Sequence, residues 1–145
     1  MATAQQNFKN HTRIRPAFHF FVLPVLFVNV VITIRGLIQS PSIGTGWGVI
    51  LAAGLLMLGL MSRAQVVTVQ DRVIRLEMRL RLRQILPPDL QARIYELTTG
   101  QLIAMRFAGD AELPELTREV LSGNLPTVKA IKQRVKNWQP DLIRA

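Results

Sequence analysis

The stretch QDRVIRLEMRLRLRQILPP, from Gln70 to Pro88, joins the most apolar part of the sequence to its most polar part. Apolar and charged residues alternate over much of it, which is the period of a β-strand. A heptad-like helical seam is also present, formed by Val66, Val69, Val73, Leu76 and Leu80. Strong helix formers dominate, and no turn residue interrupts the segment. We therefore predict an amphipathic stalk helix over 63–86, with a strand over 73–83 as the alternative.

Charge is distributed unevenly along the 145 residues. Residues 1–62 contain four basic residues and no acid, whereas residues 63–145 contain the other 14 basic residues and all nine acids. The first part is therefore an apolar region with a basic N-terminal segment over 1–16, and the second is a polar region of mixed charge. The chain has no cysteine, which excludes disulfides, zinc–thiolate sites and a thiol nucleophile.

Two uncharged apolar runs precede the stalk, over 17–34 and 43–62. As a helix, the first would extend about 27 Å, close to the hydrocarbon thickness of roughly 30 Å. A short link separates the runs, so we predict a transmembrane helical hairpin over 17–62. Asn29 lies near the middle of the first span, where its amide is expected to hydrogen-bond to its own helix, to the neighbouring helix or to another subunit.

The basic residues that flank these spans predict their orientation. Lys9, Arg13 and Arg15 precede the first span, and Arg63 follows the second, whereas the link has only Arg35 at its edge. By the positive-inside rule, both termini are expected in the cytoplasm.

Arginines in and near the stalk are candidate contacts to anionic lipids or an acidic partner: Arg63, Arg72, Arg75, Arg79 and Arg83. Nucleic-acid binding is the less favoured interpretation, because no aromatic residue is interleaved with these arginines. Two acid-before-base pairs at i, i+4, Asp71–Arg75 and Glu77–Arg81, are expected to support the helix.

Beyond the stalk, residues 87–145 are predicted to form a small domain of four short helices. Thr98 with Gln101 is a capping box, Asp110 is a candidate N-cap, and Gly123 is a candidate helix stop. We expect Phe107, Leu116 and Trp138 to pack in this domain or at an interface. A core of this size is marginal alone, which favours an interaction protein over an independent enzyme.

Few residues suit catalysis or cofactor binding. His11 and His19 are the two histidines, and either is a candidate tetrapyrrole ligand next to the membrane. Glu112, Glu115 and Glu119 share a helix face, which we interpret as a solvated face near a helix N-terminus rather than a metal site. No nucleotide-binding or hydrolase motif is present.

Several segments together resemble a family of small two-span bacterial membrane proteins of unknown function: VQDRVIRLE (69–77), ELT with QLIAMRFA (96–108), ELPEL (112–116) and AIKQRVKNWQPD (130–141). The resemblance covers nearly the whole chain. It implies two spans and a bacterial membrane, and it implies no activity or catalytic residue.

These observations predict an all-α, non-enzymatic accessory or scaffolding subunit of the bacterial inner membrane. It would dock onto a larger membrane complex or onto another copy of itself. A cofactor-contacting subunit of a respiratory or photosynthetic complex and a membrane-tethered nucleic-acid binder are the alternatives. No cofactor or metal is required by the sequence.

Overall fold

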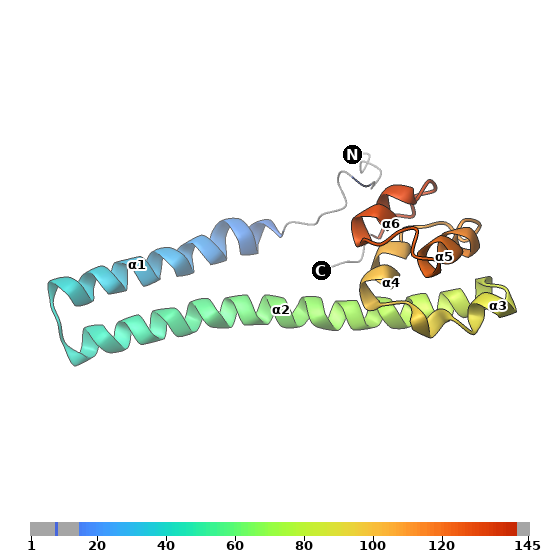
Figure 1. Ribbon diagram of the computed structural model, residues 1–145. Coiled ribbons are helices and arrows are strands. Elements are labelled where there is room, and N and C mark those ends of the chain that lie inside the picture. The colour runs from blue at the N-terminus through green and yellow to red at the C-terminus, as the bar shows by residue number, and fades with distance from the viewer. Residues whose placement is uncertain (1–7, 9–14, 142–145) are drawn as a thin grey trace. The chain divides into compact units, whose positions relative to one another are not determined.

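The computed structural model describes residue 8 and residues 15–141, and its secondary structure in these residues is helical apart from one isolated bridge, Ala108 with Trp138. The elements run in the order η1 (Ala17–Val22), α1 (Leu23–Gln39), α2 (Ile43–Ile85), α3 (Pro88–Gln91), η2 (Ile94–Glu96), α4 (Thr99–Met105), α5 (Leu113–Leu121) and α6 (Val128–Arg134) (Figure 1). The all-α prediction is confirmed. The strand alternative over 73–83 is wrong, because α2 continues through it.

Contacts divide the described residues into two compact units, 15–67 and 68–141. The first unit contains η1, α1 and the beginning of α2. Its two helices, Ala17–Gln39 and Ile43–Ile85, are long and apolar enough to cross a membrane by length and composition. Large apolar side chains on them, such as Phe27 and Leu58, are exposed.

The start of α2 is set by local hydrogen bonds. Ser42 Oγ accepts from the backbone N–H of Thr45 at 3.1 Å, and Thr45 Oγ1 donates to the carbonyl of Ser40 at 3.0 Å. These bonds satisfy backbone groups that a helix start leaves without partners. Farther along α2, Gly59 lies against α1, since an added Cβ there would be 3.2 Å from Leu26 Cδ1.

The second unit is organised around the C-terminal half of α2. Ile74, Met78 and Leu82 of α2 and Leu86 just after it are buried at a spacing of four residues and join one core with residues of α3 to α6. The residues of the heptad-like seam do not join this core: Val66, Val69, Val73, Leu76 and Leu80 are all exposed. Both rows are apolar at a helical spacing, and the path of α3 to α6 covers the other one.

Short helices complete the second unit, with three changes from the prediction. The first predicted helix is divided into α3 and η2, and α6 ends at Arg134, before Trp138. Thr98 and Gln101 form the expected capping box at α4. Asp110 is not an N-cap; Glu112 occupies that position in α5. Gly123 follows α5 with φ of 81°, a conformation that favours glycine.

Candidate functional site

Arg81, on the core-facing side of α2, contacts two distant segments of the chain. Its Nε donates to Asp110 Oδ1 at 2.8 Å, and its Nη2 donates to the carbonyl of Ala108 at 2.8 Å. The guanidinium also donates to the carbonyl of Arg106 at 3.3 Å and to Gln139 Oε1 at 2.9 Å. A planar group with several fixed donors suits this arrangement, so Arg81 connects α2 to the loop after α4 and to the C-terminal segment.

The prediction of two i, i+4 ion pairs along α2 is wrong. Neither Glu77–Arg81 nor Asp71–Arg75 is an ion pair among the residues that the structure describes. Arg81 pairs with Asp110 instead, because the packed loop places a carboxylate and two carbonyls around the guanidinium.

A pocket of about 440 Å³ lies beside Arg81, between α2, Arg106 and the C-terminal segment. Its polar lining consists of Gln70, Glu77, Arg81, Arg106, Gln139 and Asp141. Two guanidinium groups and two carboxylates balance in charge, so the pocket offers donors and acceptors without a strong net potential. Among the described residues, no group of three His, Asp or Glu side chains is placed to hold a metal ion.

Arg106 is one of the pocket residues that the sequence did not single out. Its side chain is only 7% exposed, and its Nε lies 3.0 Å from Asp141 Oδ2. The guanidinium carbon is 4.2 Å from the centroid of the Phe107 ring, and Nη1 donates to the carbonyl of Ile103 at 3.0 Å. A buried arginine needs a carboxylate and further acceptors. Here the carboxylate comes from the distant Asp141, and a carbonyl comes from Ile103 of α4. The feature of the sequence that could have indicated the burial of Arg106 is its position directly before Phe107, near the end of α4.

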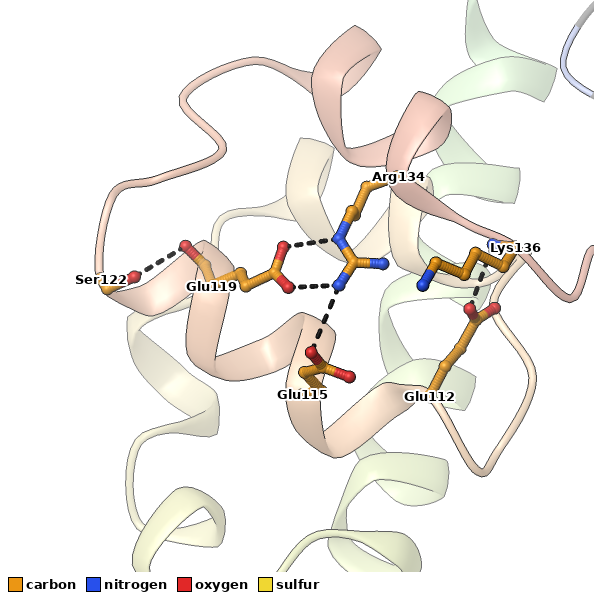
Figure 2. Close-up of polar contacts among 6 residues, drawn as sticks. All are labelled: Glu112, Glu115, Glu119, Ser122, Arg134 and Lys136. Atoms are coloured by element: carbon orange, nitrogen blue, oxygen red, sulfur yellow. Dashed lines mark hydrogen bonds and ion pairs between the residues drawn. The ribbon is translucent and has the colours of Figure 1, made fainter.

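The acidic face of α5 holds the C-terminal end of α6 (Figure 2). Arg134 donates from Nε to Glu119 Oε2 at 2.9 Å and from Nη2 to Glu119 Oε1 at 2.5 Å, and Glu115 lies 3.4 Å from the same Nη2. Glu112 accepts backbone N–H groups of Lys136 at 3.1 Å and Asn137 at 3.2 Å.

These contacts correct the interpretation of Glu112, Glu115 and Glu119 as a merely solvated face. The hydrogen bond that Arg134 donates to Glu119 is the main reason that the pKa of Arg134 is raised above its ordinary value. The carboxylates are therefore structural, and they join α5 to α6 and to the segment that follows it.

Tyr95, in η2, contacts two of the five arginines predicted to bind lipid or an acidic partner. The guanidinium carbons of Arg79 and Arg83 lie 5.0 and 5.6 Å from its ring centroid, and Arg83 Nη2 donates to the tyrosine hydroxyl. This arrangement is a pair of cation–π contacts within the unit. Part of each guanidinium group therefore contacts Tyr95 rather than solvent.

The remaining three arginines lie along the earlier part of α2. Arg72 is exposed, and Arg63 and Arg75 are half-buried. Contact of these side chains with lipid or with an acidic partner stays a prediction.

The predicted cofactor and mid-membrane residues lie in or before the first apolar helix. His19 is in η1, and its Nδ1 is 3.0 Å from the carbonyl oxygen of Arg15. His11 lies outside the described residues. The backbone carbonyl of Asn29 accepts from Thr33 Oγ1 at 3.0 Å, and Asn29 lines a shallow apolar hollow on α1. A tetrapyrrole contact stays a prediction for both histidines.

The three predicted packing residues lie in or beside the core of the second unit. Phe107 is fully buried and Leu116 is 3% exposed. Trp138 is half-buried and stacks on Phe107 with ring centroids 4.4 Å apart. The backbone carbonyl of Phe107 accepts from Gln139 at 2.7 Å, so the two aromatic residues attach the C-terminal segment beside the pocket.

Comparison with known proteins places the chain in a family but gives no function. A family model described as a family of unknown function, DUF6526, matches residues 1–145, so the chain belongs to that family. No curated protein and no solved structure matches it.

Proposed function

We propose that this protein is a non-enzymatic accessory or scaffolding subunit, anchored in a bacterial inner membrane by a helical hairpin. The observation that carries the proposal is the exposed apolar surface of α1 and of the first part of α2. An exposed apolar surface of this kind is stable in a hydrocarbon environment, whereas in water it is expected to be covered.

The hairpin is supported by the close approach of α1 to α2. Gly59 has no side chain, and Leu26 of α1 occupies the space that a Cβ would need. Small residues permit such contacts between membrane helices, where backbone approach and van der Waals packing drive association. Basic flanks before α1 and after the apolar part of α2 favour cytoplasmic termini.

A docking role for the second unit is supported by its surface and by its charged groups. The pocket arginines are paired with carboxylates of the unit, and the arginines near Tyr95 contact its ring. In contrast, α2 keeps a row of exposed valines and leucines opposite its buried face. Such a row favours a protein partner, either another subunit of a complex or a second copy.

Topology is tested with single cysteines, since the natural chain has none. Ser40→Cys is in the link, and Gln133→Cys is exposed on α6. In intact cells with a permeabilised outer membrane, we expect an impermeant maleimide to label Ser40→Cys and to label Gln133→Cys only after lysis. Release of the protein from membranes by alkaline carbonate would contradict the anchor.

Partners are tested by purification from native membranes in mild detergent through a C-terminal tag, followed by the mass of the intact assembly and a visible absorption spectrum. Co-purifying membrane subunits in defined ratio are the expected result. A bare homo-oligomer would refute the larger complex and leave self-association. An absorption band lost in His19→Ala or His11→Ala would favour the cofactor-contacting alternative. Co-purified nucleic acid whose binding falls steeply as the salt concentration rises would favour the nucleic-acid-binding alternative.

A further inference from the structure

One face of α2 in the second unit is apolar and uncovered. It consists of Val69, Val73, Leu76 and Leu80, whose exposed fractions are 58, 49, 61 and 55%; we call this row the outer seam. The core contacts of α2 use a different face, formed by Ile74, Met78 and Leu82. The helix therefore has two apolar faces, and only one of them packs within the chain.

The spacing of the outer seam is that of a coiled coil. With Val73 and Leu80 at positions a, Val69 and Leu76 fall at positions d, at alternating steps of four and three residues. A β-branched residue at a followed by leucine at d, as in Val73 and Leu76, is the combination that favours parallel two-stranded assemblies.

Polar residues beside the outer seam are complementary to a second copy in one orientation. Arg72 and Arg79 are at g positions, and Glu77 and Gln84 are at e positions. In a parallel pair, a g residue faces the e residue of the next heptad on the other helix, so Arg72 meets Glu77 and Arg79 meets Gln84 of the second copy. Both Arg72 and Glu77 are exposed, and no ion pair within the described chain involves either one.

The antiparallel orientation is opposed by the same residues. In that orientation g positions face g positions, which would bring Arg72 and Arg79 of the two copies together. Like charges at such close positions are unfavourable. The charge pattern therefore selects parallel pairing.

The proposed membrane anchor supports the same orientation, and to that extent the inference rests on the proposed function. Because α2 continues from its apolar part into the outer seam, two copies inserted with one topology have parallel α2 helices. The seam has about two heptads, which is short for a free coiled coil. Confinement to a membrane raises the effective concentration of one copy near another and offsets this weakness.

We propose that the outer seam is a homodimer interface, in which two copies of α2 form a short parallel coiled coil with a reciprocal Arg72–Glu77 ion pair. The pairing leaves the α5–α6 contacts of each copy intact, because these use other residues of the unit. It also covers one edge of the pocket, since Val73 and Glu77 line both the pocket and the proposed interface.

Disulfide crosslinking of the full chain in vesicles at low protein-to-lipid ratio tests the interface. Val73→Cys and Leu80→Cys are each expected to crosslink to the same residue of a second copy, because positions a of a parallel in-register pair meet. Thr68→Cys, exposed on another face of α2, is the matched control. In an antiparallel pair, at most one of the two seam cysteines could lie opposite the same residue of the second copy.

Two results would overturn the proposal. One is crosslinking of Thr68→Cys as efficient as that of the seam variants, which indicates random collision. The other is the absence of a crosslinked dimer for both Val73→Cys and Leu80→Cys. If carbonate extraction shows that the anchor is wrong, the same crosslinks are measured on the soluble chain, so failure of the anchor and failure of the dimer are distinguished.

Charge reversal tests the orientation independently. Glu77→Arg and Arg72→Glu each place like charges together and are expected to weaken dimerisation by about two- to tenfold, from the usual strength of exposed ion pairs. The double variant is expected to restore dimerisation, because the reciprocal pair is re-formed with opposite polarity. Failure of the double variant to recover, while each single variant keeps its helical circular dichroism, would contradict the proposed register.

Discussion

Arg81 and Asp110, 29 positions apart, are joined by a hydrogen bond of 2.8 Å between Nε and Oδ1. The bond fixes the loop between α4 and α5 on α2. Three more acceptors, the carbonyls of Arg106 and Ala108 and the side chain of Gln139, surround the same guanidinium. Arg81 thus joins α2 to the rest of the second unit, in addition to the apolar core.

Arg81→Met is expected to destabilise the second unit by about 2–4 kcal/mol, because it leaves several acceptors without their donor. Arg118→Met, on an exposed face of α5, is the matched control, and we expect it to change the free energy of unfolding by less than about 0.5 kcal/mol. Urea unfolding in micelles, followed by the fluorescence of Trp138 in a Trp47→Phe background, measures both. Equal effects of the two substitutions would contradict the role of Arg81.

The α5–α6 contact predicts non-additive substitutions. Glu119→Gln is expected to lower the melting temperature, and Glu119→Gln in an Arg134→Met background is expected to lower it much less, since the ion pair is already lost. Glu115→Gln should have a smaller effect, because its carboxylate is 73% exposed and 3.4 Å from Arg134. Thermal unfolding followed by circular dichroism provides the comparison, and additive shifts would show that the two residues act separately.

A side chain at Gly109 would require the side chain of Asn137 to move. A Cβ at this position would lie 2.7 Å from Asn137 Nδ2 and 3.3 Å from its Cγ. Gly109→Ala is therefore expected to destabilise the second unit by about 1–3 kcal/mol. The cost should fall in an Asn137→Ala background, where the obstructing amide is absent. Urea unfolding of the four variants in this cycle tests the contact, and an unchanged cost of Gly109→Ala in the two backgrounds would exclude Asn137 as its cause.

Glu96 titrates below the ordinary range because of Arg93. Arg93 donates to the two carboxylate oxygens at 2.9 and 2.7 Å, and this hydrogen bonding is the main reason that the pKa of Glu96 is lowered. A lowered pKa contributes stability that is present above the pKa of the unfolded chain, about 4.3, and is lost as pH falls through the folded value.

We expect the NMR titration of the Glu96 carboxyl to have its midpoint below that ordinary value and to shift upward in Arg93→Gln. The pair is exposed, so the accompanying change in stability should be small. Arg118→Gln, an exposed arginine on another helix, is the control and should leave the midpoint unchanged. A midpoint that does not respond to Arg93→Gln would show that the hydrogen bond is not maintained in solution.

Much of the fold could be predicted from the sequence because it depends on local interactions. Uncharged runs of 18 and 20 residues predict the two apolar helices. Thr98 and Gln101 are three positions apart and satisfy each other's backbone groups without help from the rest of the chain. Strong helix formers between 63 and 86 outweighed the alternating pattern. A family of unknown function matches the whole chain, and the membrane and bacterial nature that the resemblance implied stay predictions.

Only the tertiary structure decided which face of α2 packs and which groups its arginines contact. Val69, Val73, Leu76 and Leu80 form as good a helical row as Ile74, Met78 and Leu82, and periodicity alone cannot rank two apolar faces of one helix. The choice comes from the path of α3 to α6, which covers the second row and places Asp110 beside Arg81. Side-chain partners tens of residues apart are set by packing, and packing is a property of the folded chain rather than of any one segment.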